Sequence, residues 1–228
     1  MIDAINAEQQ YINDRINGIE TRPLIDILRD YDFTSLNEYY LAKKEWQLQN
    51  CGMVEQYCDA SEFPMKFSTL VYLKQPTLLF GDSDKTFIYH GNEEYNTQAV
   101  EDLQIPVYEI GYEGGTIVGA AGDLSIGIFY PDTIDLRSDY ILDKIVSILQ
   151  NHGIAAEVDS NDVLVNGKKV LGSAHLTSNG FFVFVAYVSF SDKAELIQKI
   201  CGDATKSPSH LIGISRGELI RGLSEWLL

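Results

Sequence analysis

The stretch that decides the fold is residues 140–174, which read YILDKIVSILQNHGIAAEVDSNDVLVNGKKVLGSA. Its first part predicts a helix over residues 135–152, because apolar side chains recur at helical spacing. The positions that carry this pattern are Leu136, Ile141, Leu142, Ile145, Ile148 and Leu149. Gly153 follows where a left-handed helix cap belongs, so we expect the helix to end there.

The second part of the stretch predicts a β-hairpin. Two β-prone runs, 162–165 and 169–176, are separated by Asn166-Gly167. Both turn residues tolerate the positive φ that a tight hairpin requires, so this pair is a strong turn signal. Another β-like run, 155–158, precedes the hairpin, and a further strand is predicted over 181–190.

The flanking sequence alternates between helix and strand signals. Residues 67–73 and 76–80 are short apolar runs that we interpret as strands. Further strands are expected at 106–110 and 124–130, and helices at 1–20, 24–31, 36–49, 92–103, 192–200 and 215–228. Strands with helices before, between and after them predict an α+β fold, a mixed sheet packed by helices.

Composition narrows the class of protein. The chain has 228 residues, of which 45% are hydrophobic, and its formal net charge is −16. Duplex nucleic acid and anionic membrane surfaces are bound through clustered Lys and Arg, so neither is an expected partner. No window of about 18 apolar residues predicts a transmembrane helix. The first residues do not resemble a signal peptide. Three cysteines cannot all pair, so we expect a cytoplasmic protein.

The charge is unevenly distributed. Residues 86–136 contain no Lys or Arg but nine acidic side chains. The four histidines are scattered, so no metal site is predicted. A polyanion site beside Glu109 and Glu113 in this stretch would therefore be repulsive unless a divalent metal intervened.

A motif in the deciding stretch resembles the lipoate-protein ligase branch of the biotin/lipoate ligase superfamily. In that branch an Asn-Asp strand and a turn precede a strand of the form Gly-Lys-Lys-(Ile/Val)-x-Gly-Ser-Ala. The matching residues here are Asn161, Asp162, Gly167, Lys168, Lys169, Gly172, Ser173 and Ala174. Weaker similarities lie at Leu73–Gly81, at Ile105–Val107 followed by Gly114-Gly115-Thr116, and at Lys206–Ser209. The resemblance runs, with gaps, over about residues 34–215.

The resemblance implies an acyl site that holds lipoate or an octanoyl group. The ligases activate the acid with ATP and Mg²⁺ and transfer it to a lysine of a lipoyl-type acceptor protein. Lys169 would be the reactive-centre lysine, because a positioned ammonium stabilises charge that develops on the acyl oxygen. Asp162 would orient that lysine or a metal. The implied substrate-binding residues are Gly114, Gly115, Thr116, Asn161, Gly172 and Ser173, with the glycines allowing backbone N–H groups close approach.

The sequence departs from the family pattern around the glycine loop. The Arg-Arg pair that usually leads this loop is replaced by Glu109-Ile110, and the His-Asp that usually follows it is replaced by Gly119-Ala120. ATP use is therefore open. An octanoyltransferase that works without ATP is one alternative, in which Cys201 would act with Lys169, since a nearby ammonium favours the thiolate. A ligase-like domain that binds a ligand or partner without catalysis is another.

Blander interpretations also fit these residues. Lys168-Lys169 could simply be solvent-exposed lysines beside the hairpin turn. Gly114-Gly115 could be only a tight turn, and Cys201 could serve only in packing. For the domain organisation we expect an N-terminal helical extension over 1–33 and a ligase-like catalytic domain over 34–228, without a separate C-terminal accessory domain.

Overall fold

The computed structural model describes residues 1–110 and 115–228. Within-chain contacts divide it into two compact units, Met1–Cys51 and Gly52–Leu228. No helix within the described ranges is both long and apolar enough to cross a membrane.

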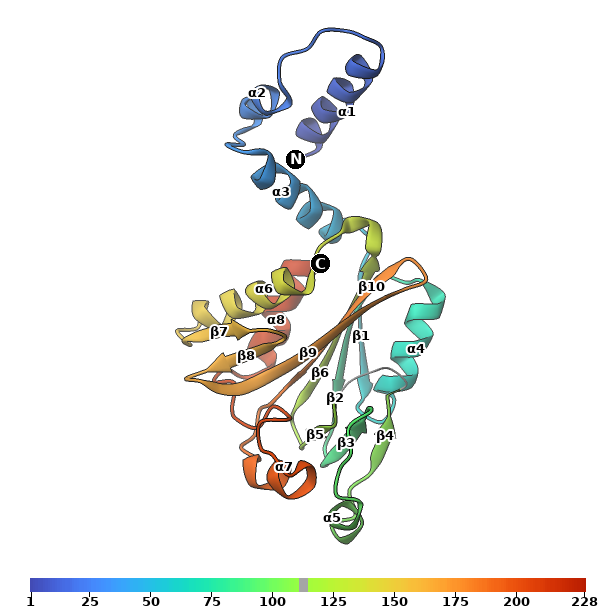
Figure 1. Cartoon of the computed structure of the whole chain (residues 1–228), viewed down its shortest axis with the longest axis vertical. Coiled ribbons are helices and arrows are strands. Elements are labelled where there is room, and N and C mark those ends of the chain that lie inside the picture. Colours follow the sequence, from blue (N-terminus) through green and yellow to red (C-terminus); the bar gives the residue numbers. More distant parts are fainter. Residues whose placement is uncertain (111–114) are drawn as a thin grey trace. The chain divides into compact units, whose positions relative to one another are not determined.

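The first unit is helical. It contains α1 (Ile2–Ile16), α2 (Leu24–Leu28), the 3-10 turn η1 (Arg29–Tyr31) and α3 (Leu36–Gln49) (Figure 1). Tyr39 of α3 is buried against Ala4 and Leu28 and donates a 2.8 Å hydrogen bond to the Glu8 carboxylate. This core ties α3 to the helices before it. The helical unit therefore includes α3 and extends to Cys51. The expected domain organisation, 1–33 and 34–228, stays a prediction.

The second unit is built on a seven-stranded mixed sheet with the order β1-β2-β6-β10-β9-β8-β7. Only β1 and β2 pair in parallel; the other neighbours are antiparallel. The strands are β1 (Val54–Asp59), β2 (Thr77–Asp82), β6 (Leu124–Pro131), β7 (Ala156–Asp159), β8 (Asp162–Val165), β9 (Lys168–Ser178) and β10 (Phe181–Val188). The predicted α+β class is confirmed.

The deciding stretch folds as the sequence predicts. Its helix is α6 (Ser138–Asn151), and Gly153 after it has a φ of 79°. The hairpin joins β8 to β9, with φ values of 52° at Asn166 and 70° at Gly167. These are the left-handed conformations that a two-residue hairpin turn of this kind requires.

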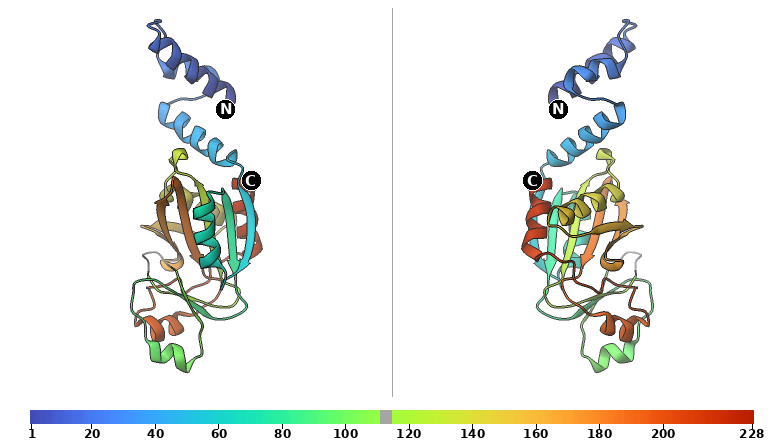
Figure 2. Two further views of the ribbon diagram at one scale, coloured as in Figure 1. Left: turned by 90° about the vertical axis from the view of Figure 1, so that its right-hand side faces the viewer. Right: turned by 90° about the vertical axis from the view of Figure 1, so that its left-hand side faces the viewer.

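A second, three-stranded sheet packs beside the large one, in the order β4-β3-β5. Its strands are β3 (Phe87–His90), β4 (Val107–Glu109) and β5 (Ile117–Gly119). The remaining elements are α4 (Phe63–Leu73), α5 (Thr97–Asp102), the 3-10 turn η2 (Asp132–Ile134), α7 (Ala194–Cys201) and α8 (Arg216–Leu227). Helix α4 lies on one face of the large sheet, and α6 and α8 lie on the opposite face (Figure 2).

One strand prediction is wrong. Residues 67–73 belong to helix α4, not to a strand. Phe63, Phe67 and Leu70 recur at helical spacing and are all buried in one core cluster with Leu79 and Phe129 of the sheet. Pro64 lies in the first turn, where a proline needs no partner for the N–H that it lacks. A short apolar run is compatible with either structure, and here packing against the sheet selects the helix.

Candidate functional site

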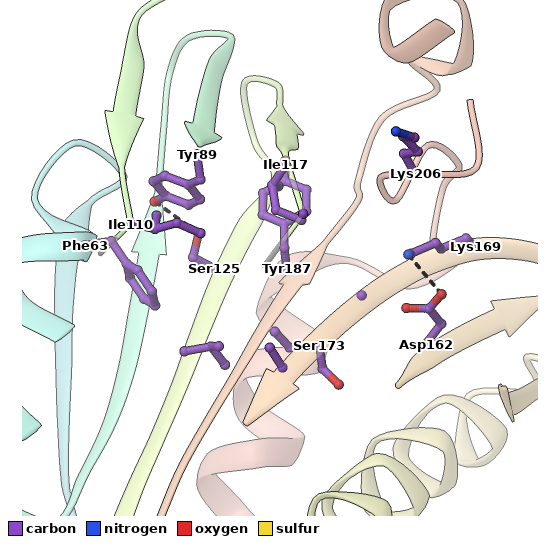
Figure 3. Close-up of a pocket in the computed structure, with 15 residues that line it drawn as sticks. Phe63, Tyr89, Ile110, Ile117, Ser125, Asp162, Lys169, Ser173, Tyr187 and Lys206 are labelled. Atoms are coloured by element: carbon purple, nitrogen blue, oxygen red, sulfur yellow. Dashed lines mark hydrogen bonds and ion pairs between the residues drawn. The ribbon is translucent and has the colours of Figure 1, made fainter. Parts of the chain in front are cut away.

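A cavity of about 150 Å³ lies between α4, the small sheet and the β9–β10 part of the large sheet. Figure 3 shows the side chains around it. The described residues that line it are Phe63, Tyr89, Ile110, Gly115, Ile117, Ser125, Asp162, Lys169, Gly172, Ser173, Ala174, Val185, Ala186, Tyr187 and Lys206. The aromatic and aliphatic residues form one end, which we call the apolar end. Asp162, Lys169 and Lys206 form the other, which we call the charged end.

The apolar end is part of the protein core. Phe63, Tyr89, Ile110 and Tyr187 all belong to the cluster that packs α4 on the sheet. The Tyr89 hydroxyl donates a 2.8 Å hydrogen bond to the Ala60 carbonyl and accepts one of 3.3 Å from Ser125. With these polar atoms occupied, the wall offers mainly aromatic and aliphatic surface. Such a wall suits an apolar chain.

Lys169 and Asp162 form an ion pair at the charged end, with 2.9 Å between Nζ and Oδ2. The side chains are 19% and 31% exposed, so the pair is only partly screened by water. Asp162 starts β8 and Lys169 lies next to the start of β9. The two predicted catalytic residues are thus in direct contact.

A β-bulge sets the direction of Lys169. Asp162 pairs with Gly172, and Val163 with Leu171, but Leu164 then pairs with Lys169, so Val170 is the extra residue. In a regular strand, residues 169 and 172 would point to opposite faces, because side chains alternate. The bulge places Lys169 opposite Leu164, on the same face as Asp162 and Gly172. Bulges commonly redirect side chains beside active sites.

Gly172 leaves room for the lysine side chain. A Cβ at this position would lie 3.1 Å from Lys169 Cε and 3.5 Å from Asp162 Oδ1. Ser173, the next residue, lines the cavity, but its hydroxyl donates a 2.7 Å hydrogen bond to the Asn161 carbonyl. Asn161 itself is exposed and is not among the described lining residues. It fixes the start of the hairpin rather than the cavity wall.

The glycine-rich segment is only partly described. Gly114 lies outside the described residues, while Gly115 lines the cavity. Thr116 is buried, and its hydroxyl donates a 2.9 Å hydrogen bond to the Glu93 carbonyl. Thr116 therefore anchors this segment to the loop before α5 and does not reach the cavity in the described part of the structure.

Cys201 is not among the described residues that line the cavity. It is the last residue of α7 and packs against the cluster that contains Ile88 and Ile200. Burial raises the pKa of its thiol, and the opposing effect of Lys206 does not reverse this. A raised pKa keeps the thiol protonated near neutral pH, which disfavours a nucleophilic role.

Behind the cavity wall lies a buried charge cluster that sequence patterns did not indicate. Asp123 accepts hydrogen bonds from Tyr187 and from the Phe190 backbone N–H, and pairs with Lys193 at 2.5 Å. The Lys193 and Asp123 side chains are 4% and 0% exposed. Burial, followed by the Asp123 charge, raises the Tyr187 pKa well above its usual value. Tyr187 is consequently a neutral part of the wall, held in place by a charged anchor.

Sequence reasoning also assigned no role to several lining residues. Lys206 was noticed only as part of a weak similarity, and Phe63, Tyr89 and Tyr187 come from separate elements. No local spacing connects these positions, so only the folded chain brings them together. Within the described ranges, no group of three or more His, Cys, Asp or Glu residues could hold a metal ion.

Comparison with known proteins gives a consistent family assignment. A family model described as the lipoyl protein ligase A/B catalytic domain matches residues 48–221. Lipoate-protein ligase LplJ of Bacillus subtilis (strain 168) is 28% identical over 130 residues. That alignment covers 56% of this chain and 38% of LplJ, so the chain matches well under half of this curated relative.

Solved structures share the fold. Plasmodium falciparum LipL1, solved in complex with lipoate, superposes with a TM-score of 0.66 at 16% identity, over 77% of this chain and 61% of that one. A bipartite lipoate protein ligase from Thermoplasma acidophilum gives a TM-score of 0.63 at 17% identity, over 78% and 84% of the two chains. Because the family model covers most of the chain, this protein belongs to the lipoyl protein ligase A/B catalytic-domain family.

Proposed function

We propose that this protein transfers lipoate or a related medium-chain acyl group to a lysine of an acceptor protein. The observation that carries the proposal is a cavity with an aromatic, apolar end and a charged end that contains the Lys169–Asp162 pair. A lipoate-like acid has the same division, because its chain is apolar and its carboxylate is anionic. Membership of the ligase family supports the same substrate class.

The residues of the cavity would divide the work of binding and activation. Burial of the acyl chain at the apolar end would contribute roughly 0.8 kcal/mol for each buried methylene. The Lys169 ammonium, held by Asp162, would donate to the acyl carbonyl oxygen. When the acceptor amine attacks the carbon of the acyl-adenylate, a C–N bond would form and negative charge would develop on that oxygen, so a fixed donor there lowers the barrier. The bond to the phosphate oxygen would then break, AMP would leave with the electron pair, and the amine would lose a proton.

We favour the ligase route over an octanoyltransferase route that uses Cys201. The thiol packs in a separate cluster and its pKa is raised, whereas both lysines of the charged end line the cavity. A solved lipoate-protein ligase A of similar fold was crystallised with ATP. For this chain, ATP would be a co-substrate, and Asp162, the carboxylate among the described lining residues, would hold the Mg²⁺ that accompanies its phosphates.

The acceptor and location follow from the same proposal. The acceptor would be a lipoyl-type domain; the archaeal ligase of similar fold was studied together with its E2 lipoyl domain. We place the reaction in the cytoplasm, since an odd number of cysteines is typical of a reducing compartment. The acidic net charge argues against nucleic acid or membrane partners.

The test measures the mass of a purified lipoyl acceptor domain after incubation with the full chain. One reaction contains lipoate, ATP and Mg²⁺, and a second contains an octanoyl thioester without ATP. We expect a lipoyl mass increase in the first. Lys169→Ala should abolish it, and Lys168→Ala, which removes the neighbouring exposed lysine, should not.

Each other result has a clear meaning. Product from the thioester alone, lost in Cys201→Ser, would establish the octanoyltransferase alternative and refute the ligase route. No product in either reaction from folded protein would refute acyl transfer and leave a ligand- or partner-binding role. Full activity of Lys169→Ala would overturn the site assignment.

A further inference from the structure

A second lysine reaches the cavity from a segment far from the hairpin. Lys206 follows α7 and lines the same cavity as Lys169. Figure 3 shows the two lysines on different chain segments on the same side of the cavity. We call residues Lys206–Ser209 the strap. Its geometry shows whether Lys206 is an incidental surface charge or part of the site.

The strap is fixed to the elements that build the site. Ser207 and Ser209 are 0% and 3% exposed. The Ser207 hydroxyl accepts a 3.2 Å hydrogen bond from the Val118 backbone N–H of β5. The Ser209 N–H donates to the Lys169 carbonyl at 3.2 Å, and the Ser209 carbonyl accepts from the Lys193 N–H at 3.0 Å. The backbone that carries Lys206 is thus tied to the bulge that carries Lys169.

The tip of Lys206 is held much less firmly. Its Nζ lies 3.6 Å from Glu93 Oε2, and the two side chains are 38% and 47% exposed. The Lys169–Asp162 pair is shorter and more buried. Exposed pairs of the looser kind contribute little to stability, so an incoming anion can replace Glu93 as the partner at small cost. The backbone at Lys206 is therefore fixed, while its ammonium group is available to bind an anion.

The charge distribution gives this ammonium a role. Residues 86–136 supply Ile110, Gly115, Ile117 and Ser125 to the cavity but contain no Lys or Arg. An anionic head in the cavity would therefore meet no positive charge from that side. We propose that Lys206 binds the anionic head of the acyl substrate together with Lys169, as a carboxylate of the free acid or a phosphate of the activated one. This inference rests on the proposed function and names a residue that confers specificity for an anionic head.

The test compares ligands that differ only in head charge, by calorimetric titration of the full chain. Lipoate carries a carboxylate, lipoamide has the same chain with a neutral amide, and AMP supplies the phosphate. We expect Lys206→Met, which keeps the aliphatic stem, to weaken lipoate binding about tenfold, the loss of one charge-assisted contact, and to leave lipoamide binding unchanged. If Lys206→Met also weakens AMP binding, the phosphate of the activated acid is an additional or alternative anion that Lys206 binds.

Two further variants control the experiment. Lys199→Met removes an exposed lysine of α7 that is not among the described lining residues and should leave all three affinities unchanged. Glu93→Gln removes the competing carboxylate and should strengthen lipoate binding about threefold, a small effect typical of an exposed pair.

The outcomes separate this inference from the function on which it rests. If wild type binds lipoate, and Lys206→Met binds both lipoate and AMP as tightly as wild type does, the role of Lys206 is refuted while the acyl site stands. Equal weakening of lipoate and lipoamide would also refute it, because the lysine would then act only through structure. If wild type binds neither lipoate nor lipoamide, the proposed function fails and the role of Lys206 fails with it.

Discussion

At the scale of single residues, the site depends on how closely side chains can approach Lys169. Gly172 lies beside the lysine stem, and the buried Asp123–Lys193 pair holds Tyr187 against the other side of the cavity. Neither Gly172 nor the Asp123–Lys193 pair has to contact the substrate to affect the site. Each fixes the position of a group that lines the cavity.

Gly172→Ala should impair acyl transfer more than stability. The added carbon would lie 3.1 Å from Lys169 Cε, a contact that the flexible lysine relieves by moving away from Asp162. We expect transfer to fall about tenfold, since a displaced catalytic group loses alignment with the reacting atoms. The unfolding free energy should change by less than about 1 kcal/mol. The measurements are transfer by mass spectrometry and unfolding in urea.

Gly217→Ala is the matched control, because nothing lies within 4 Å of the added carbon and the residue is in helix α8. It should leave transfer unchanged and stabilise the protein by roughly 0.5–1 kcal/mol, as expected for glycine in a helix. Unaltered transfer in Gly172→Ala would show that the position of the Lys169 stem is not restricted by this contact.

Lys193→Met should destabilise the protein strongly. It leaves the fully buried Asp123 carboxylate without its cation, and breaking a buried pair in this way costs about 3–5 kcal/mol. Lys199→Met removes the same charge from an exposed position of the following helix and should change stability by less than about 0.5 kcal/mol. Urea unfolding measures both variants. A loss below about 1 kcal/mol in Lys193→Met would mean that the pair is not required to hold the wall.

Local residue patterns account for one half of the site and not for the other. Asp162, Lys169 and Gly172 lie within one hairpin, so a sequence motif can identify them together. Lys206 meets the cavity only because the strap is hydrogen-bonded to β5 and to the bulge. Those contacts join segments far apart in the chain, and no local pattern predicts them. The bulge was also not predicted, although it decides the face on which Lys169 lies.

At the scale of elements, strong local signals gave correct predictions and short apolar runs did not. Helix α6 and the β8–β9 hairpin have a long apolar stripe and a turn pair that allow few alternatives. The 67–73 run has neither, and its helix is selected by packing against the sheet. The predicted helix over 92–103 is shorter, beginning at Thr97, where the Asn96 side chain accepts a 3.1 Å hydrogen bond from the Ala99 N–H.

Helix α8 begins with a capping box whose strength should depend on pH. The Ser215 N–H donates to the Glu218 carboxylate at 2.8 Å, and the Ser215 hydroxyl donates to it at 2.7 Å. These hydrogen bonds lower the pKa of Glu218, with the hydroxyl contributing most. A carboxyl with a lowered pKa in the folded state stabilises that state above its unfolded pKa, and the contribution is lost as the pH falls through the lowered value.

Glu218→Gln should therefore be less stable than wild type at pH 7, and the difference should shrink as the pH falls below about 4.5, the ordinary carboxyl value. Unfolding in urea at a series of pH values measures the difference. Glu225→Gln removes the same charge near the other end of the helix, where a carboxylate opposes the helix dipole, so it should not reduce stability. A difference for Glu218→Gln that is constant from pH 7 to pH 3 would contradict the charged cap.

At the scale of the whole molecule, the net charge of −16 matters through its distribution. One wall of the cavity comes from the stretch without basic residues, and the facing lysines come from β9 and the strap. The fold thus joins an acidic segment to cations supplied later in the chain. Only tertiary packing reveals that α3 packs with α1 and α2, because no local pattern in the sequence connects these helices.

The central claim is that the cavity is an acyl site with Lys169 at the head of the substrate. A crystal structure of the full chain with lipoate tests it most directly. We predict the acyl chain against Tyr89, Ile117 and Tyr187, with a carboxylate oxygen about 3 Å from Lys169 Nζ, an ordinary charge-assisted hydrogen-bond distance. Lipoate bound elsewhere, or bound in the cavity with its head turned away from Lys169, would contradict the claim.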